Sequence, residues 1–362
     1  MITVSLCMIV RDEEETLGRC LSTVCDLVDE IIIADTGSVD RTKEVAASFG
    51  ARVFDFKWMD HFAAARNFAF EKASMSYIFW LDADDVLEEV DRFRFQKLKE
   101  RQDFDFDYVS MPYHLTLDEK GQPVHYQRRN RLVKRQCKFM WHGAVHEYLA
   151  VGGNGLHSDI AVTHRKIKPY SYRNLQIYLK CKARGEVFEP RDQYYFANEL
   201  YDHGRNEEAV EQYQIFLDSG LGWIEDQIAA CYKQAVCYAR LNQPDKQIQS
   251  LVRSLAYDAP RAELCCKLGA FFADKQDFQK AIYWYRQATM LERPQDAMGM
   301  TDESAWTWLP HLQLCYCYDR IGDISKSKIH HDMAKMYNPT HPSVLYNEAY
   351  FAGRSEQQFS AQ

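Results

Sequence analysis

The sequence predicts a protein of two parts, an α/β domain built on a parallel sheet and then an all-α domain of helical repeats. Over the first 90 residues, short apolar runs alternate with segments whose apolar residues recur at helical spacing. After Lys168-Pro169 the β pattern is almost absent and helical segments recur. In this second part equivalent positions recur after 34 residues, from Asn242 to Gln276 and from Pro260 to Pro294.

Four apolar runs in the first part are predicted to be buried strands. They are apolar on both faces, as expected of strands in a parallel sheet that helices cover on both sides. The runs are 3–10, 30–35, 51–56 and 77–81, and the helices predicted between them are 17–24, 41–49 and 62–72. Since crossover helices join parallel strands, we expect the carboxyl ends of the strands at one edge, where such sheets bind ligands.

The secondary-structure pattern of the remaining residues predicts where the domains begin and end. Short β patterns at 107–113, 131–133 and 160–164 lie between turns and predict a mixed extension of the first domain, which therefore covers 1–168. We expect a linker helix over 169–191, repeats over 192–350 and a tail over 351–362.

The second part has the features of a helical repeat. Turn sequences recur at 204–209, 242–245, 275–278 and 321–323. The small residue Ala209 follows Gly204 by five positions, as Ala281 follows Gln276. This pattern resembles tetratricopeptide repeats, in about three to four units. The segment 295–304 interrupts the period. We attribute the many aromatic residues of this part to packing between repeats.

Composition excludes several classes of protein. With 46% apolar and 27% charged residues the chain is neither disordered nor collagen-like. No run approaches the roughly 18 uncharged apolar residues of a membrane-spanning helix, and the apolar start is followed at once by the charged run 11–15, unlike a signal peptide. Eleven cysteines without a C-x-x-C pair indicate reduced thiols and a cytoplasmic protein. The net charge of −8, with no basic domain, disfavours duplex nucleic acid as a partner.

The strongest chemical signal is the acidic segment Asp82-Ala83-Asp84-Asp85, directly after the strand 77–81. Three carboxylates at a strand end repel one another unless a cation or hydrogen-bond donors lie among them. Oxygen ligands of this kind suit Mg²⁺ or Mn²⁺. The alternative is an acidic start to a helix at 86–89.

A second polar segment, 35–40, follows the strand 30–35. Asp35 would lie where the base or ribose of a nucleotide is read, and Thr36, Gly37 and Ser38 permit close approach of the backbone. The alternative is an ordinary strand-to-helix turn that requires a glycine and a cap.

Taken together, these segments resemble family 2 glycosyltransferases. The resemblance lies in residues 3–40, in Ala64-Ala65-Arg66-Asn67 and in Trp80-Leu81-Asp82-Ala83-Asp84. The nearest subgroup joins such a domain to tetratricopeptide repeats, as in peptide S-glycosyltransferases of bacteriocin pathways. The resemblance implies a GT-A fold, a Rossmann-like sheet that binds a nucleoside-diphosphate sugar.

The resemblance also implies roles for single residues. Asp35 would contact the base, and Arg66 would lie near the nucleotide. Asp82 and Asp84 would hold the metal ion, and Asp82 would also contact the nucleotide sugar. The remaining residues expected in the nucleotide-sugar pocket are Val10, Arg11 and Glu13, whereas Asp12 stands where the subgroup more often has asparagine.

Two further segments follow from the same resemblance. Trp141 to Glu147 resembles an H-E segment in which Glu147 would be the general base, with a structural role as the alternative. His142 and His146 are four apart, but Gly143 argues against the helix that such a zinc pair needs. His164 would lie by the metal or the diphosphate, and an ordinary loop histidine is its alternative.

A basic run, with six cations between Arg128 and Lys138, is the last candidate. Its segment 131–134 resembles an R-L-F-R segment of the subgroup, which implies that Arg131 contacts the nucleotide sugar. The alternative is that this basic run is only a solvent-exposed surface. If the acceptor is a nucleic acid, we expect the basic run to bind it.

The resemblance therefore implies a metal-dependent, inverting glycosyltransferase of hexosyl or related groups, with a UDP-sugar as the favoured donor. A peptide, a glycan and a nucleic acid all stay open as acceptors, and the repeats could bind the acceptor or a second copy of the chain as a homodimer. One alternative is a nucleotidyltransferase, but its usual glycine-rich loop is replaced by the acidic run 12–15. The other is a non-catalytic adaptor with a nucleotide-sugar-binding domain.

Overall fold

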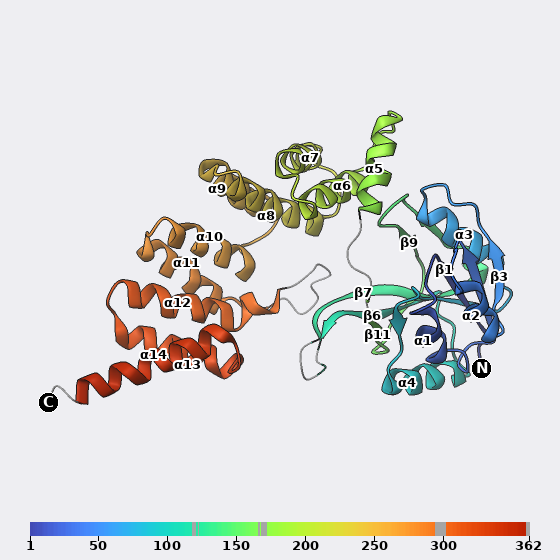
Figure 1. Cartoon of the computed structure of the whole chain (residues 1–362), viewed down its shortest axis with the longest axis horizontal. Helices are drawn as coiled ribbons and strands as arrows, with labels where there is room; N and C mark the ends of the chain where they lie inside the picture. Colours follow the sequence, from blue (N-terminus) through green and yellow to red (C-terminus); the bar gives the residue numbers. More distant parts are fainter. Residues whose placement is uncertain (118–120, 122, 166, 168–171, 294–301, 360–362) are drawn as a thin grey trace. The chain divides into compact units, whose positions relative to one another are not determined.

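The computed structural model divides the chain into two compact units, Met1–Phe196 and Ala197–Gln362. Figure 1 colours the first unit blue to green and the second yellow-green to red. The structure describes residues 1–117, 121, 123–165, 167, 172–293 and 302–359. Residues 169–191, expected to be a linker helix, belong to the first unit as far as the structure describes them.

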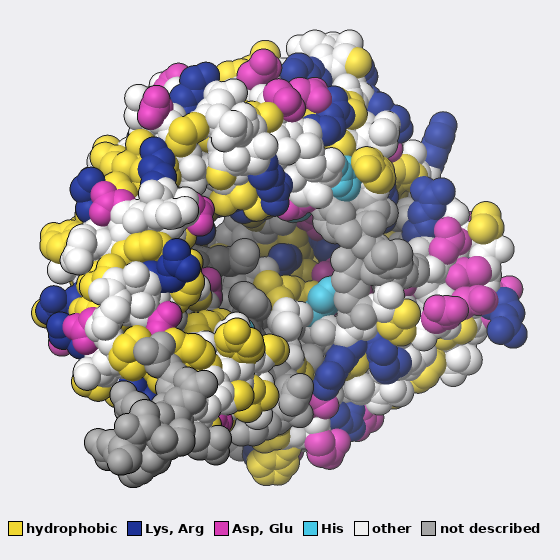
Figure 2. All heavy atoms as spheres, turned by 60° about the vertical axis from the view of Figure 1, so that its left-hand side comes forward, with side chains coloured by type: hydrophobic (Ala, Val, Ile, Leu, Met, Phe, Trp, Pro, Cys, Tyr) yellow, Lys and Arg dark blue, Asp and Glu magenta, His cyan; other side chains and the backbone are white. Residues whose placement is uncertain are grey.

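Charged side chains of both signs are interspersed on the face shown in Figure 2. This mixture fits a net charge of −8 that is spread along the chain rather than gathered in one domain.

The first unit contains a large mixed sheet. Among the described residues it has nine strands, in the spatial order β3-β2-β1-β4-β7-β6-β11-β5, with β10 beside β6. Its strands are β1 (Val4–Val10), β2 (Glu30–Asp35), β3 (Arg52–Asp55), β4 (Tyr77–Trp80), β5 (Asp85–Val86), β6 (Tyr108–Leu117), β7 (Pro123–Lys134), β10 (Gly155–His157) and β11 (Val162–His164). A separate hairpin is formed by β8 (Met140–His142) and β9 (Tyr148–Ala150).

The four strands expected to be parallel do lie together and parallel. β1 pairs with β2 on one side and β4 on the other, and β2 pairs with β3. In this register Val10 is opposite Asp35, and Cys7 is opposite Trp80. The acidic segment after β4 therefore begins at the same edge of the sheet as the ends of β1 and β2, as the sequence predicts.

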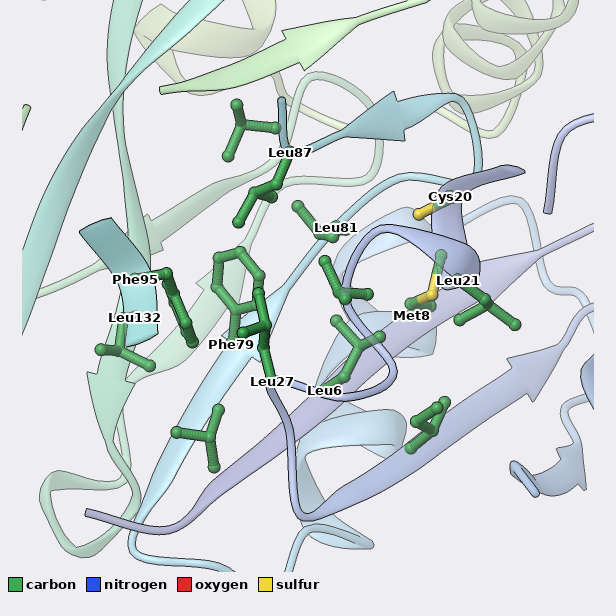
Figure 3. Packing of buried hydrophobic residues seen from close by; sticks show 14 of the residues in the cluster. Leu6, Met8, Cys20, Leu21, Leu27, Phe79, Leu81, Leu87, Phe95 and Leu132 are labelled. Atoms are coloured by element: carbon green, nitrogen blue, oxygen red, sulfur yellow. The ribbon is translucent and has the colours of Figure 1, made fainter. Parts of the chain in front are cut away.

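Helices cover both faces of this sheet. They are α1 (Leu17–Ser22), α2 (Thr42–Ser48), α3 (Phe62–Glu71) and α4 (Glu89–Glu100). Alternate residues of β1 point to opposite faces, so Leu6 and Met8 pack with α1 and α4, whereas Cys7 packs with α3 and the β8–β9 hairpin. Figure 3 shows the first of these two cores, in which Phe79 and Phe95 lie together beside Leu132.

The mixed extension contains longer strands than the sequence pattern indicates. β6 and β7 form a long antiparallel pair with register shifts, and β7 pairs antiparallel with β4. β11 lies parallel to β6 and brings His164 opposite Asp85 of β5. Helix α5 (Arg173–Ala183) belongs to the first unit, and the boundary between the two units falls within α6 (Pro190–Asp202).

The second unit is helical throughout its described residues. Its helices are α7 (Asn206–Asp218), α8 (Ile224–Arg240), α9 (Pro244–Arg253), α10 (Ala262–Asp274), α11 (Phe278–Met290), α12 (Trp308–Arg320), α13 (Ile324–Tyr337) and α14 (Pro342–Phe359). All four predicted turns separate consecutive helices, for example α10 and α11. Of the predicted interruption at 295–304, residues 295–301 lie outside the described residues. The expected tail continues α14 as far as Phe359.

Candidate functional site

A cavity of about 490 Å³ opens at the carboxyl-terminal edge of β1 and β4. Its wall includes side chains from β1 and the loop after it, from the acidic segment, from α3 and from the loop between β8 and β9. Of the residues expected in the site it includes Val10, Arg11, Glu13, Arg66, Asp82, Asp84 and Glu147. The structure thus brings together seven side chains that lie up to 137 positions apart in the sequence.

Arg66 is the centre of a buried network in this cavity. Its Nη2 donates to Asp82 Oδ1 and its Nε donates to Glu147 Oε1, both at 2.6 Å. The guanidinium packs against the adjoining rings of Trp80 and Trp141, 4.8 Å from each centroid. Since the other buried residues of α3 are all alanines (Ala63, Ala65 and Ala69), the helix can approach the sheet closely and bury this cation.

The ion pairs of this network favour the charged forms of Asp82 and Arg66. Burial by itself would raise the pKa of Asp82, but the charge and hydrogen bond of Arg66 hold that pKa well below its usual range. Burial would likewise lower the pKa of Arg66, and Asp82 and Glu147 together raise it instead. Asp82 is therefore a carboxylate whose charge is already balanced by a fixed cation.

A second cluster contains the only group of three potential metal ligands found among the described residues, Asp84, Asp85 and His164. One ligand atom of each lies within 4.8 Å of the others. His164 Nδ1 is 3.5 Å from Asp84 Oδ1 and 3.6 Å from Asp85 Oδ1, and it also contacts the Tyr113 hydroxyl at 2.9 Å. The short strands β5 and β11 create this cluster because they place His164 opposite Asp85.

The titration of this cluster follows from burial and mutual repulsion. Burial raises the pKa of Asp84 to about 6, with Asp82 and Asp85 adding to the rise and His164 opposing it. Burial opposes protonation of His164, yet the Asp85 and Asp84 carboxylates raise its pKa overall. Asp85 Oδ1 is buried and has no hydrogen-bond partner. Two carboxylates, one imidazole and an unused buried oxygen fit a divalent cation such as Mn²⁺ or Mg²⁺.

Arg131, which was expected to contact the nucleotide sugar, lies behind the cavity wall. It is fully buried, and its Nη1 lies 3.0 Å from Asp85 Oδ2. Its guanidinium is 3.8 Å from the centroid of the Trp80 ring and 4.5 Å from that of Tyr113. Arg131 does not line the cavity, so its direct effect in the structure is to hold Asp85 behind Asp84.

Asp35 also lies behind the cavity wall. Its Oδ1 accepts hydrogen bonds from the backbone N–H groups of Gly37 and Ser38, each at 2.9 Å, and closes the turn after β2. Its Oδ2 is buried without a partner, while the neighbouring Thr36 lines the cavity. The turn chemistry that the sequence left as an alternative is therefore present, and a contact with a base stays a prediction.

The other predicted segments have mostly structural contacts. In the basic run, Arg128 donates to the backbone oxygens of Ser110 and Ser158, and Lys134 pairs with Asp105. His142 and His146 belong to no metal-ligand group among the described residues. His146 stacks on Tyr195, with ring centroids 4.2 Å apart.

Several cavity residues were not predicted from the sequence. Trp58 and Phe62 come from the segment before α3 and its first residue, and Arg173, Arg191 and Tyr195 come from α5 and α6. Their only sequence signal was aromatic or basic character, which does not distinguish a cavity wall from a surface. Arg173 and Arg191 also lie in the segment 169–191, which was expected to be a linker.

Comparison with known proteins supports the fold assignment. Residues 5–151 match the sequence profile of Glycosyl transferase family 2, a segment that includes the acidic segment and all strands of the sheet except β10 and β11. Over 87 residues the chain is 54% identical to the TPR repeat-containing protein Synpcc7942_0270 of Synechococcus elongatus, covering 24% of this chain and 22% of that protein. Over 223 residues it is 26% identical to the SPbeta prophage-derived glycosyltransferase SunS of Bacillus subtilis, covering 58% of this chain and 52% of that protein.

The chain thus spans between about a fifth and about half the length of these two relatives. Among solved structures, glucosyl-3-phosphoglycerate synthase from Mycobacterium tuberculosis in complex with Mn²⁺ and UDP is similar, with 14% identity and a TM-score of 0.35. That match covers 52% of this chain and 82% of the synthase. No helix among the described residues is both long and apolar enough to cross a membrane.

Proposed function

We propose that this chain, whose residues 5–151 form a family 2 glycosyl transferase domain, transfers a sugar from a nucleoside-diphosphate sugar to an acceptor nucleophile. The observation that carries the proposal is the cavity at the ends of β1 and β4, which gathers Asp82, Asp84 and Glu147 around Arg66. The nucleoside would lie along Val10, Arg11 and Glu13, with its diphosphate towards the acidic segment. A UDP-sugar is the donor we favour.

Metal dependence is part of the proposal. Asp84, Asp85 and His164 would hold Mg²⁺ or Mn²⁺, with Asp82 held near them by Arg66. The bound cation supplies positive charge that stabilises the leaving diphosphate. Arg131 contributes by holding the Asp85 carboxylate in place through an ion pair.

Glu147 is the proposed general base. One of its oxygens accepts from Arg66, whereas its other oxygen makes no hydrogen bond within the described part of the chain. That second oxygen would take the proton of the acceptor as the acceptor attacks the anomeric carbon from the side opposite the diphosphate, which inverts the configuration. We assign acceptor binding to the repeats, with a peptide, a glycan and a nucleic acid as the candidate classes.

The decisive experiment measures metal-dependent turnover of a donor. The purified chain is incubated with Mn²⁺ and a panel of nucleotide sugars, and slow hydrolysis is followed by release of the nucleoside diphosphate. We expect one donor to turn over and Asp84→Asn to lower Mn²⁺ affinity by more than the roughly 10- to 100-fold that loss of an outer-shell partner costs. Glu147→Gln should lower turnover by about 10²–10⁴-fold and leave Mn²⁺ binding intact.

Asp103→Asn is the matched control, because Asp103 is an exposed carboxylate that pairs with Arg101 away from the cavity. It should change neither turnover nor Mn²⁺ affinity. If no nucleotide sugar binds or turns over, the chain is not a glycosyltransferase, and binding of a partner to the repeats would then support the adaptor alternative.

A further inference from the structure

Six arginines line the cavity, and they differ in how they are already used. Arg11 lies 3.9 Å from a carboxylate oxygen of Asp12, and Arg129 packs 5.2 Å from the centroid of the Tyr113 ring. Arg66 is committed to Asp82 and Glu147. Arg128 is bound to backbone oxygens of the sheet, and Arg191 to the backbone oxygen of His146. Within the described residues, the guanidinium of Arg173 makes neither a hydrogen bond nor an ion pair, although it packs 4.7 Å from the centroid of the Phe62 ring. Arg173 is exposed to solvent at the cavity wall, and a charged side chain without a partner at that place is available to a ligand.

The position of Arg173 is defined by its charged neighbours. The groups that act on it through space are Glu147, Glu13, Arg11 and Asp82. Glu13 and Arg11 follow β1, and Asp82 follows β4, the strand next to β1. Arg173 therefore shares the cavity wall with residues that follow β1 and β4.

The local backbone adds to this positive charge. Arg173 is the first residue of α5, a helix of 11 residues whose N-cap makes no side-chain hydrogen bond. Arg173 and Asn174 both line the cavity, so the first turn of the helix borders it. The N-terminus of a helix carries partial positive charge and favours anions.

The cavity wall carries more cations than carboxylates, which suits an anionic ligand such as a diphosphate. Its four carboxylates are those of Glu13, Asp82, Asp84 and Glu147, and its six guanidiniums are those of Arg11, Arg66, Arg128, Arg129, Arg173 and Arg191. Two of the carboxylates already share Arg66, so attraction of a diphosphate falls to the other guanidiniums.

We infer that Arg173, which lies outside the segment matched by the family profile, binds the diphosphate of the nucleotide sugar. The inference rests on the proposed function and deepens it by assigning a substrate-binding role to the helix after the sheet domain. Arg173 would hold the phosphate oxygens of the donor and stay paired with the free nucleoside diphosphate after transfer.

The test compares binding of UDP and of uridine, in the presence of Mn²⁺, to the full chain and to Arg173→Gln. We expect Arg173→Gln to weaken UDP binding by about 10- to 100-fold, since a charge-assisted phosphate contact is lost. Uridine affinity and melting temperature should stay unchanged, whereas a merely structural role would lower both ligands' affinities together. Arg173→Lys should recover part of the UDP affinity, because it restores the charge without the planar fork.

Arg184→Gln is the matched control, because Arg184 caps the other end of α5 and pairs with Glu186. It should leave UDP binding unchanged. If the unaltered chain binds UDP and Arg173→Gln binds it equally well, the inference is wrong and the proposed function stands. If the unaltered chain binds none of UDP, GDP, ADP and dTDP, the proposed function fails and the inference fails with it.

Discussion

Two buried arginines of the first unit organise its acidic segment. Arg66 forms ion pairs with Asp82 and Glu147, whereas Arg131 forms an ion pair with Asp85. Both guanidiniums also pack on the Trp80 ring. Asp84 is the member of the segment that neither arginine pairs with. Because burial and two other carboxylates raise its pKa to about 6, it is the residue whose charge depends most on an added cation.

The pair of Arg131 and Asp85 should be costly to break, because neither side chain is exposed to solvent. We expect Arg131→Met to lower the free energy of unfolding by about 3–5 kcal/mol, since it leaves a buried carboxylate without its cation. Urea denaturation measures the change. Adding Asp85→Asn to Arg131→Met should recover part of the loss.

Lys134→Met is the control on the same strand. Lys134 pairs with Asp105, whose side chain is 86% exposed, so its loss should cost about 0–1 kcal/mol. Equal losses in the two variants would contradict the assignment of Arg131 and Asp85 as a buried pair.

At the scale of elements, the second unit depends on close contact between paired helices. In α10, Gly269 faces the ring of Tyr285 in α11, and an added Cβ would lie 2.7 Å from two ring atoms. Tyr285 is 2% exposed and belongs to the core formed by α10, α11 and α12. The glycine therefore sets the distance between the two helices of a repeat.

Gly269→Ala should destabilise the chain despite the better helix propensity of alanine. Alanine gains about 1 kcal/mol over glycine in an exposed helix interior, but overpacking costs about 1–3 kcal/mol and displaces Tyr285. We expect a net loss, measured as a lower urea midpoint.

Gly353→Ala provides the comparison, because Gly353 lies in helix α14 and an added Cβ there meets nothing within 4 Å. That variant should raise the midpoint slightly. If Gly269→Ala is also stabilising, the contact with Tyr285 does not limit the spacing of α10 and α11.

At the scale of the whole molecule, each unit has cores of its own. The clusters around Leu6 and Cys7 contain only residues of the first unit, and those around Cys265, Leu268 and Val344 contain only residues of the second. The cavity likewise is lined only by residues up to Tyr195. Ligand binding should therefore stabilise one unit and not the other.

Calorimetry tests this expectation. We expect two unfolding transitions, of which Mn²⁺ with UDP at about 100 times the dissociation constant raises only one, by about 5–10 °C. Asp84→Asn should abolish that shift and leave the other transition in place. A single transition that moves as a whole would contradict separate cooperative units.

The site was predictable where the chemistry lies within one segment. The acidic residues after β4 and the polar turn after β2 were found because a strand pattern precedes each of them. Resemblance placed Arg66 and Glu147 in the site, but their ion pair was not predicted, since they are 81 positions apart and no spacing rule connects them. Arg173 was missed because a single arginine in a predicted linker looks like any exposed cation.

The sequence by itself determined the order of strands and helices, the parallel edge that carries the acidic segment, and the helical repeats, because hydrophobic periodicity and turn residues are local properties. Only the tertiary structure decided which carboxylate meets which cation. Asp82 and Asp85 are neutralised by arginines from α3 and β7, His164 reaches Asp84 through the pairing of β11 with β5, and Arg173 enters the cavity from α5. The physical reason is that ion pairing depends on distance and burial, and both are set by the packing of segments far apart in the chain.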